Sequence, residues 1–177
     1  MYEQFNLDFI LYWAFGGFAF KTLGKMLFDS DFDPEGLTDL TNYLARRFKR
    51  ELIHFPGAVR RLRDFHHGYT EAMGHYDVVV SPTTGQLSPA LGHLGMHLRG
   101  ELTFARVEQW ACFTPLCNVS GAPSLSLPLG HDDESNLPVG MCFHGHHGAE
   151  RLLFELALQL EDAQPFRQLP DAGSPSQ

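Results

Sequence analysis

The spacing of apolar residues changes from a helical to an extended pattern near residue 76. Residues 4–28, 37–53 and 58–75 carry apolar side chains three or four positions apart, which predicts three helices. The next stretch, 76–82 ("YDVVVSP"), is a β-branched run closed by proline and predicts a strand. Its three consecutive valines do not alternate with polar residues, so a buried parallel or mixed sheet suits it. The order of these patterns indicates helices packed on a sheet.

The second half of the chain alternates between the same two patterns. Residues 83–100 are rich in Gly, Pro and His and predict a long loop, and 104–118 return to a helical pattern that Pro115 interrupts. Two further strands are predicted at 124–130 ("SLSLPLG") and 139–145 ("VGMCFHG"), and they are close enough to form a hairpin. An amphipathic leucine-rich helix follows them.

About three strands are predicted beside four or more helices, which is a small sheet for this much helix. A three-stranded sheet with one final helix leaves apolar strand edges open, and open edges invite pairing with other strands. We therefore expect an α/β fold in which these strands are part of a larger mixed sheet. The remaining strands would come from a missing segment, from a partner chain or from self-association.

Charge argues against a nucleic-acid partner. The formal net charge is −8, from 21 acidic and 13 basic residues, whereas binding to a phosphate backbone needs a basic face. Seven of the 13 bases lie within residues 46–63. That cluster indicates the solvated faces of two helices, with a local anion-binding patch as the alternative.

The longest apolar run, Phe9 to Phe20, is too short to cross a membrane. Twelve helical residues rise about 18 Å, against about 30 Å of hydrocarbon. No membrane span is expected, and the run predicts a buried or partner-facing helix, with a membrane-surface helix as the alternative. No secretory leader follows Met1, and the three cysteines (Cys112, Cys117 and Cys142) include no Cys-x-x-Cys, so we expect a cytoplasmic protein without disulfides.

The residue types that catalyse reactions are present without the partners they need. Ser124 and Ser126 alternate with leucines and have no base nearby in the sequence. They are therefore interpreted as structural serines on a solvent-poor strand face, and Ser120 is interpreted as structural too. His93 and His97 have metal-ligand spacing, but the glycines around them disfavour a helix, and no metal site is predicted. The clustered histidines at 144, 146 and 147 are interpreted as loop residues near a pocket rim.

Three separated motifs lie in the second half of the chain. Their positions are Tyr76-Asp77, Pro82-Thr83, Asn118, Gly121, Pro123, Pro128, Gly130, Leu137-Pro138, Gly140 and the helix from Glu150. In these motifs and their order, over about residues 76–166, the chain resembles the C-terminal part of the amidase signature family. The resemblance implies that residues 76–168 form the C-terminal part of the amidase signature domain. The helical patterns before it predict a helical region at 1–75, and the polar, Pro-containing residues after it predict a flexible tail at 169–177.

The resemblance also implies a function. Intact relatives hydrolyse amide carbon–nitrogen bonds with a serine nucleophile, a second serine and a lysine, and need no metal or organic cofactor. Their Gly-Gly-Ser-Ser-Gly-Gly-type segment has no counterpart in these 177 residues, so no catalytic residue is assigned here. Thr114 and Cys117 correspond to positions that line the acyl side of the substrate pocket.

We therefore expect a fragment that supplies scaffold and pocket wall and is inactive alone. It would bind a small-molecule amide only when the missing N-terminal segment completes the site. The alternative is a non-catalytic binding or assembly module that docks on a partner chain through the Phe-rich first helix.

Overall fold

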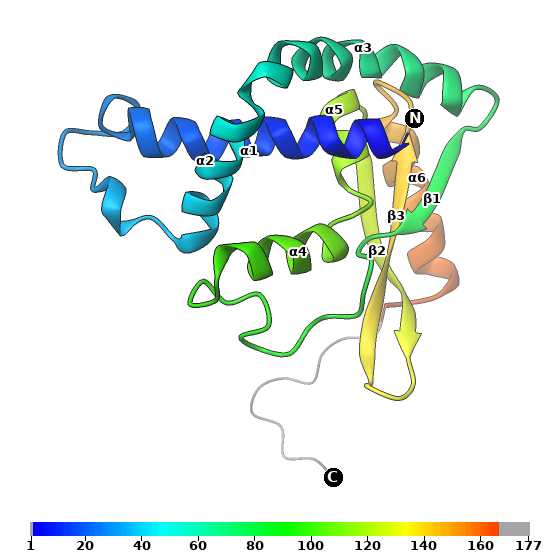
Figure 1. Ribbon diagram of the computed structural model, residues 1–177. Helices are drawn as coiled ribbons and strands as arrows, with labels where there is room; N and C mark the ends of the chain where they lie inside the picture. Colours follow the sequence, from blue (N-terminus) through cyan, green and yellow to red (C-terminus); the bar gives the residue numbers. More distant parts are fainter. Residues whose placement is uncertain (1, 167–177) are drawn as a thin grey trace.

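A computed structural model describes residues 2–166 of the chain (Figure 1). The first part is helical and contains α1 (Tyr2–Leu27), α2 (Asp39–Glu51) and α3 (Phe55–Met73). Two short 3₁₀ turns, Pro34–Gly36 and Leu52–His54, connect them. These helices confirm the three predicted from apolar spacing, with ends shifted by a few residues.

Aromatic side chains dominate the core of the helical part, where α1 crosses α2 and meets α4 (Gly100–Trp110). The Trp13 and Phe104 rings stack with centroids 5.6 Å apart. A half-buried ion pair ties α1 to α3, since the exposed Arg61 donates two hydrogen bonds to the buried Asp8 carboxylate, at 2.7 and 2.6 Å. The buried residues of this core are Ile10, Leu11, Ala14, Leu44, Phe48, Ala58 and Phe104.

The sheet has three strands in the order β1-β3-β2, with β1 (Val78–Pro82), β2 (Ser124–Asp132) and β3 (Leu137–Gly145). The predicted hairpin is confirmed, because β2 and β3 pair antiparallel across a short turn. Strand β1 lies at one edge and pairs antiparallel with β3.

The α/β class is confirmed, but two details of the sheet differ from expectation. Both pairings among the described strands are antiparallel, so the parallel component of a mixed sheet is not found within them. Strand β1 is also less buried than its valines predicted. Val79 and Val80 are 39% and 49% exposed, because β1 has a neighbouring strand on one side only.

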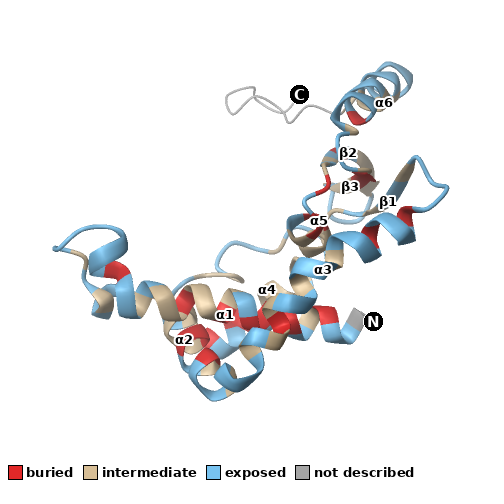
Figure 2. Ribbon diagram, turned by 90° about the horizontal axis from the view of Figure 1, so that it is seen from above, coloured by how far each residue is buried: buried red, intermediate tan, exposed pale blue. Residues whose placement is uncertain are grey.

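The two faces of the sheet are covered differently. Helix α6 (Glu150–Ala163) packs on one face, where Leu153 meets Leu127 and Phe143. The other face meets the short helix α5 (Pro115–Ser120) and α3. Seen from above, α1, α2 and α4 form one arm, the sheet with α6 forms another, and α3 and α5 lie where the arms meet (Figure 2).

Sequence expectations for the remaining segments have mixed outcomes. The helical pattern at 104–118 is two helices, α4 and α5, and Pro115 starts the second, as its position suggested. The predicted flexible tail at 169–177 lies outside the described residues. Within residues 2–166, no helix combines the length and apolarity that a membrane crossing requires.

Candidate functional site

The short helix α5 and the turn after it carry the residues predicted to line the substrate pocket. Thr114 directly precedes the helix, and Pro115 occupies its first turn, where the missing backbone N–H breaks no helical hydrogen bond. Gly121 ends the helix with a φ of 74°, a left-handed conformation that favours glycine. The chain then passes almost directly into β2, which places α5 at one end of the sheet.

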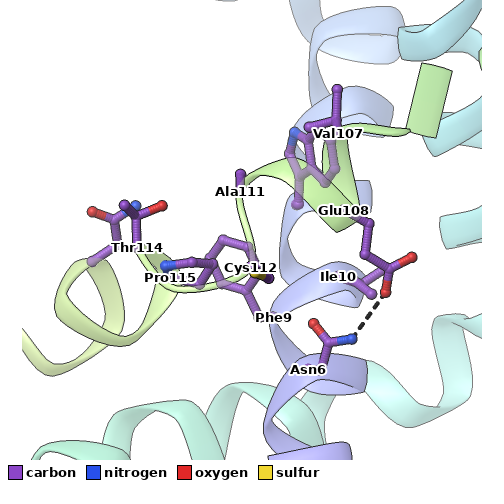
Figure 3. A pocket seen from close by; sticks show the side chains of 11 residues that line it. Asn6, Phe9, Ile10, Val107, Glu108, Ala111, Cys112, Thr114 and Pro115 are labelled. Carbon is purple, nitrogen blue, oxygen red and sulfur yellow. Dashed lines mark hydrogen bonds between the residues drawn. The ribbon is translucent and has the colours of Figure 1, made fainter. Parts of the chain in front are cut away.

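A cavity of about 190 Å³ lies between α1 and the connection from α4 to α5 (Figure 3). Phe9 and Ile10 contribute apolar walls from α1, and Thr114 contributes a hydroxyl-bearing side chain from the other side. Asn6 donates a hydrogen bond of 2.9 Å to Glu108 across the cavity. The cavity thus offers apolar walls with a few polar groups, in a space smaller than most ligand pockets of about 300–1,000 Å³.

Cys117, the second predicted pocket residue, has different surroundings. It follows Thr114 by one turn of α5, but it is buried and does not line this cavity. Its Sγ lies 2.9 Å from Nδ1 of His144 on β3. The structure therefore places the two predicted residues on one helical turn, with only Thr114 facing this cavity.

A chain of hydrogen bonds runs from Cys117 to strand β1. His144 Nε2 lies 2.8 Å from the Ser81 hydroxyl, which itself donates to the Pro82 carbonyl oxygen at 2.9 Å. Because the Ser81 hydroxyl already donates its one hydrogen bond to that carbonyl, its oxygen accepts a hydrogen bond from Nε2–H of the imidazole. Nδ1 then accepts the thiol proton of Cys117.

Burial opposes ionisation of this thiol–imidazole pair. It raises the pKa of the Cys117 thiol and lowers the pKa of the His144 imidazole. Both shifts favour the neutral forms, whereas a cysteine nucleophile needs a thiolate beside a cation. Burial also raises the pKa of neighbouring Tyr69 to about 12, and its hydroxyl donates to the Gly145 carbonyl oxygen at 2.8 Å. The group is thus a set of neutral hydrogen-bonding partners.

The serines of the turn and of β2 have structural contacts. Ser120 is buried, and its Oγ accepts from the Ala122 amide. The Ser126 hydroxyl lies 2.6 Å from that of Thr83 and is exposed, so the expected solvent-poor environment of the β2 serines is wrong. The polar face of β2 is only partly covered by α5 and α3.

Lysine, the base that the family resemblance implies, lies elsewhere in the described chain. The Lys21 ammonium group donates to the Asn42 side-chain oxygen, and Lys49 lies over the Phe18 ring. Within residues 2–166, no recorded interaction joins a lysine to a hydroxyl of residues 120–126. The described residues therefore contain no serine–lysine pair at this turn.

The histidines divide into different environments. His93 and His97 lie in the loop before α4, as expected, and the described residues contain no group of three or more His, Cys, Asp or Glu side chains that could hold a metal ion. His144, in contrast, was interpreted as a residue near a pocket rim and is instead buried in β3, within the strand predicted at 139–145. It is buried because α5 packs over this end of the sheet face, where Cys117 contacts it.

Sequence reasoning therefore missed His144 and Ser81 as partners of Cys117. One signal was available, since two-residue alternation in "MCFHG" puts Cys142 and His144 on the same face of a strand. Which side chains meet that face depends on the register of β1 against β3 and on the docking of α5, and local sequence does not encode either.

The order of motifs, the α/β fold and the α5–β2 turn define the class of enzyme to which this chain is related. The chain belongs to the amidase family, whose sequence model matches residues 35–154. This match confirms the resemblance inferred from the three motifs and extends it into α2 and α3.

Relatives of known name agree with this assignment. The chain is 38% identical over 162 residues to the protein named "Putative amidase AmiC" of Mycobacterium tuberculosis (strain ATCC 25618 / H37Rv), covering 92% of this chain and 34% of the relative. It is 33% identical over 122 residues to a 6-aminohexanoate-cyclic-dimer hydrolase of Paenarthrobacter ureafaciens, covering 66% and 23%. The chain thus spans about a third or less of the length of these relatives.

Solved structures show the same fold relationship. One structure of a 6-aminohexanoate cyclic dimer hydrolase superposes with a TM-score of 0.62 and 28% identity, covering 76% of this chain and 29% of that one. A substrate complex of a 6-aminohexanoate cyclic dimer hydrolase superposes with a TM-score of 0.70 and 24% identity, covering 90% and 35%. The arrangement of helices and strands in this chain is therefore found within a larger amidase-type fold.

Proposed function

We propose that this chain supplies scaffold and one wall of the substrate pocket in a cytoplasmic enzyme that hydrolyses amide carbon–nitrogen bonds. Membership of the amidase family supports the reaction class. The attacking serine and its lysine-linked proton relay would come from residues outside this sequence. The observation that carries the proposal is the start of α5, where Thr114 lies at the edge of a cavity, while no serine–lysine pair is found beside it among residues 2–166.

A labelling experiment tests whether the chain is inactive alone. The purified chain is incubated with a serine-directed fluorophosphonate probe and assayed on simple aryl amides and esters, with a full-length relative as the positive control. We expect labelling and turnover by the relative and neither by this chain, because nucleophile and oxyanion stabilisation are both needed for the reaction. Labelling of any serine in this chain would overturn the inactive assignment.

The pocket-wall role predicts an effect on substrate binding. Residues 35–154 replace the matching segment of a full-length amidase relative, and Thr114→Val is compared with the unmodified chimera. Loss of one hydrogen bond to substrate should raise KM by about fivefold to tenfold, with kcat nearly unchanged. Thr84→Val, in the loop after β1, is the matched control. An unchanged KM for Thr114→Val would remove this residue from the pocket.

A binding or assembly module remains the second candidate, and the surface of α1 favours it. Tyr12, Phe20 and Leu23 are 52%, 45% and 41% exposed on this helix, and Tyr12 and Phe20 line one apolar hollow together, as residues of an interaction site do. Size-exclusion chromatography with light scattering distinguishes the candidates. A monomer that hydrolyses nothing and binds nothing would contradict the module, whereas a stable complex formed through α1 would support it.

A further inference from the structure

We propose that His144 is a positioning residue that holds α5, and with it the proposed pocket wall, against the sheet through the thiol of Cys117. The consequence for the pocket wall rests on the proposed function. The contact between Cys117 and His144 does not depend on any activity. Cys117 and His144 are 27 positions apart in sequence, and both are more than nine-tenths buried. The contact therefore joins two distant segments in the interior.

Each ring nitrogen of His144 has one partner, and the donors and acceptors are all matched. Nδ1 accepts from the Cys117 thiol at 2.9 Å, and Nε2–H donates to Ser81 Oγ at 2.8 Å. The Ser81 hydroxyl donates its own hydrogen bond to the Pro82 carbonyl oxygen. A side chain that only filled space would not need two matched polar partners. A buried ring nitrogen without a hydrogen-bond partner would destabilise the fold.

Helix α5 needs such an external contact. It has six residues, too few for a helix to be stable by its own hydrogen bonds. Its C-terminal end is held by a second histidine, since His147 Nε2 lies 2.7 Å from the Ser120 carbonyl oxygen. The His144 contact holds the middle of the helix, one turn from Thr114. Loss of that contact would let the Thr114 side of the cavity move.

Two substitutions separate the thiol contact from the Ser81 contact. In His144→Asn, the side-chain oxygen can occupy the place of Nδ1 and accept from Cys117, whereas the Ser81 contact is lost. In His144→Gln, the longer amide can reach the place of Nε2 and donate to Ser81, whereas the thiol loses its bond to β3 position 144 and keeps only the neighbouring Ser124 and Tyr69 hydroxyls. Gln is also nearer to His in size, so a purely space-filling role predicts that Gln is the better replacement.

Hydrogen exchange of the full chain reads out the position of α5. The reporter amides are Gly121, bonded to the Cys117 carbonyl oxygen at 2.9 Å, and Asn118, bonded to that of Thr114. We expect His144→Gln to exchange at these amides about fivefold faster than wild type, the factor for one lost hydrogen bond, and His144→Asn to stay near wild type. Amides of α6 should not change in either variant. Equal acceleration in both variants, or slower exchange in Gln than in Asn, would overturn the proposal.

Infrared spectroscopy of the S–H stretch supplies a second readout, which is taken on the wild-type protein. The Cys117 band is identified in wild type as the band lost in Cys117→Ser, and we expect it at the lowered frequency of a hydrogen-bonded thiol. A Cys117 band at the frequency of an unbonded thiol would overturn the proposal. If both readouts behave as expected while Thr114→Val leaves KM unchanged in the chimera, then positioning stands and the pocket-wall function fails.

Discussion

Burial of His144 couples the stability of the molecule to pH. Its folded pKa lies below the ordinary value of about 6.5, so the unfolded chain binds the proton first as pH falls. The stabilising contribution is complete above about pH 6.5 and is lost as pH falls towards the lower folded pKa. We expect the urea midpoint of wild type to fall between about pH 7 and pH 5 more steeply than that of His144→Asn. The other nine histidines are common to both proteins, and parallel curves would contradict the prediction.

A second buried ionisable group acts in a lower pH range. Hydrogen bonds from Arg61 hold the pKa of Asp8 below its ordinary value, against the opposing effect of burial. The unfolded carboxylate therefore protonates first, and the stabilisation is present above about pH 4 and lost as pH falls through the lower folded pKa.

Arg61→Met tests this assignment. Without the guanidinium, only the Gln4 hydrogen bond still opposes the effect of burial, so the pKa of Asp8 rises relative to wild type and acid unfolding followed by circular dichroism should begin at a higher pH. Arg60→Met removes a neighbouring exposed charge and serves as the control. The same acid midpoint in both variants would mean that Arg61 does not set the ionisation of Asp8.

Single residues were predictable from sequence where their chemistry is local. The turn at Gly121 follows from its motif. The leucines around Ser124 put no base near it in the sequence, but the register of β2 against β3 places His144 opposite it in the sheet. The partner of Cys117 did not follow, because His144 reaches it only through the docking of α5 on β3. Exposure of Ser126 was also missed, since it depends on how much of the sheet face the helices cover.

At the scale of elements, adjacent glycines in α1 have opposite roles. A Cβ on Gly17 would lie 2.8 Å from the Leu44 Cβ and 3.2 Å from the Thr41 carbonyl oxygen of α2, whereas a Cβ on Gly16 meets nothing within 4 Å. Gly17 therefore permits the close approach of α1 and α2. Gly16, in the interior of the same helix, destabilises the folded state through its conformational entropy and permits no close packing in return.

The pair gives a matched test in one helix. Gly17→Ala should lower the free energy of unfolding by about 1–3 kcal/mol, because backbone and Cβ atoms must move apart. Gly16→Ala should raise it by about 0.5–1 kcal/mol through helix propensity. Urea denaturation measures both. Destabilisation by Gly16→Ala, or tolerance of Gly17→Ala, would show that the crossing of α1 and α2 differs from the one described.

The sequence predicted which segments are helices and strands better than it predicted how the strands pair. Apolar spacing identifies α1, α2, α3 and α6, and proline correctly marks the start of α5. The exposure of β1 was not predictable from its valines, since a run of β-branched residues has the same sequence pattern in a central strand and in an edge strand. Its antiparallel register against β3 depends on tertiary contacts between segments about 60 residues apart in the sequence.

At the scale of the whole molecule, the accessible surface is too large for a compact chain of this mass. It amounts to 12143 Å² for 19.9 kDa, against about 8,700 Å² expected for a compact monomer. The excess is larger than the roughly 1,800 Å² that the twelve residues outside the described part could add even if fully extended. We therefore infer that part of the described surface is buried against another polypeptide in the assembled protein.

Strand β1 is where this surface would most readily pair with another chain. Its outer edge has no neighbour among the described strands, and Val80 is 49% exposed on it. Unpaired N–H and C=O groups beside apolar side chains favour edge-to-edge association, and a lysine on the edge opposes it because its charge would be buried in the new contact. We expect Val80→Lys to lower the concentration-dependent mass of the chain towards 19.9 kDa in light scattering, with little change in the unfolding midpoint. Ser88→Lys adds the same charge in an exposed loop and should leave association unchanged. If both variants associate like wild type, then the contact that buries the excess surface lies elsewhere, and the exposed face of α1 becomes the place to substitute next.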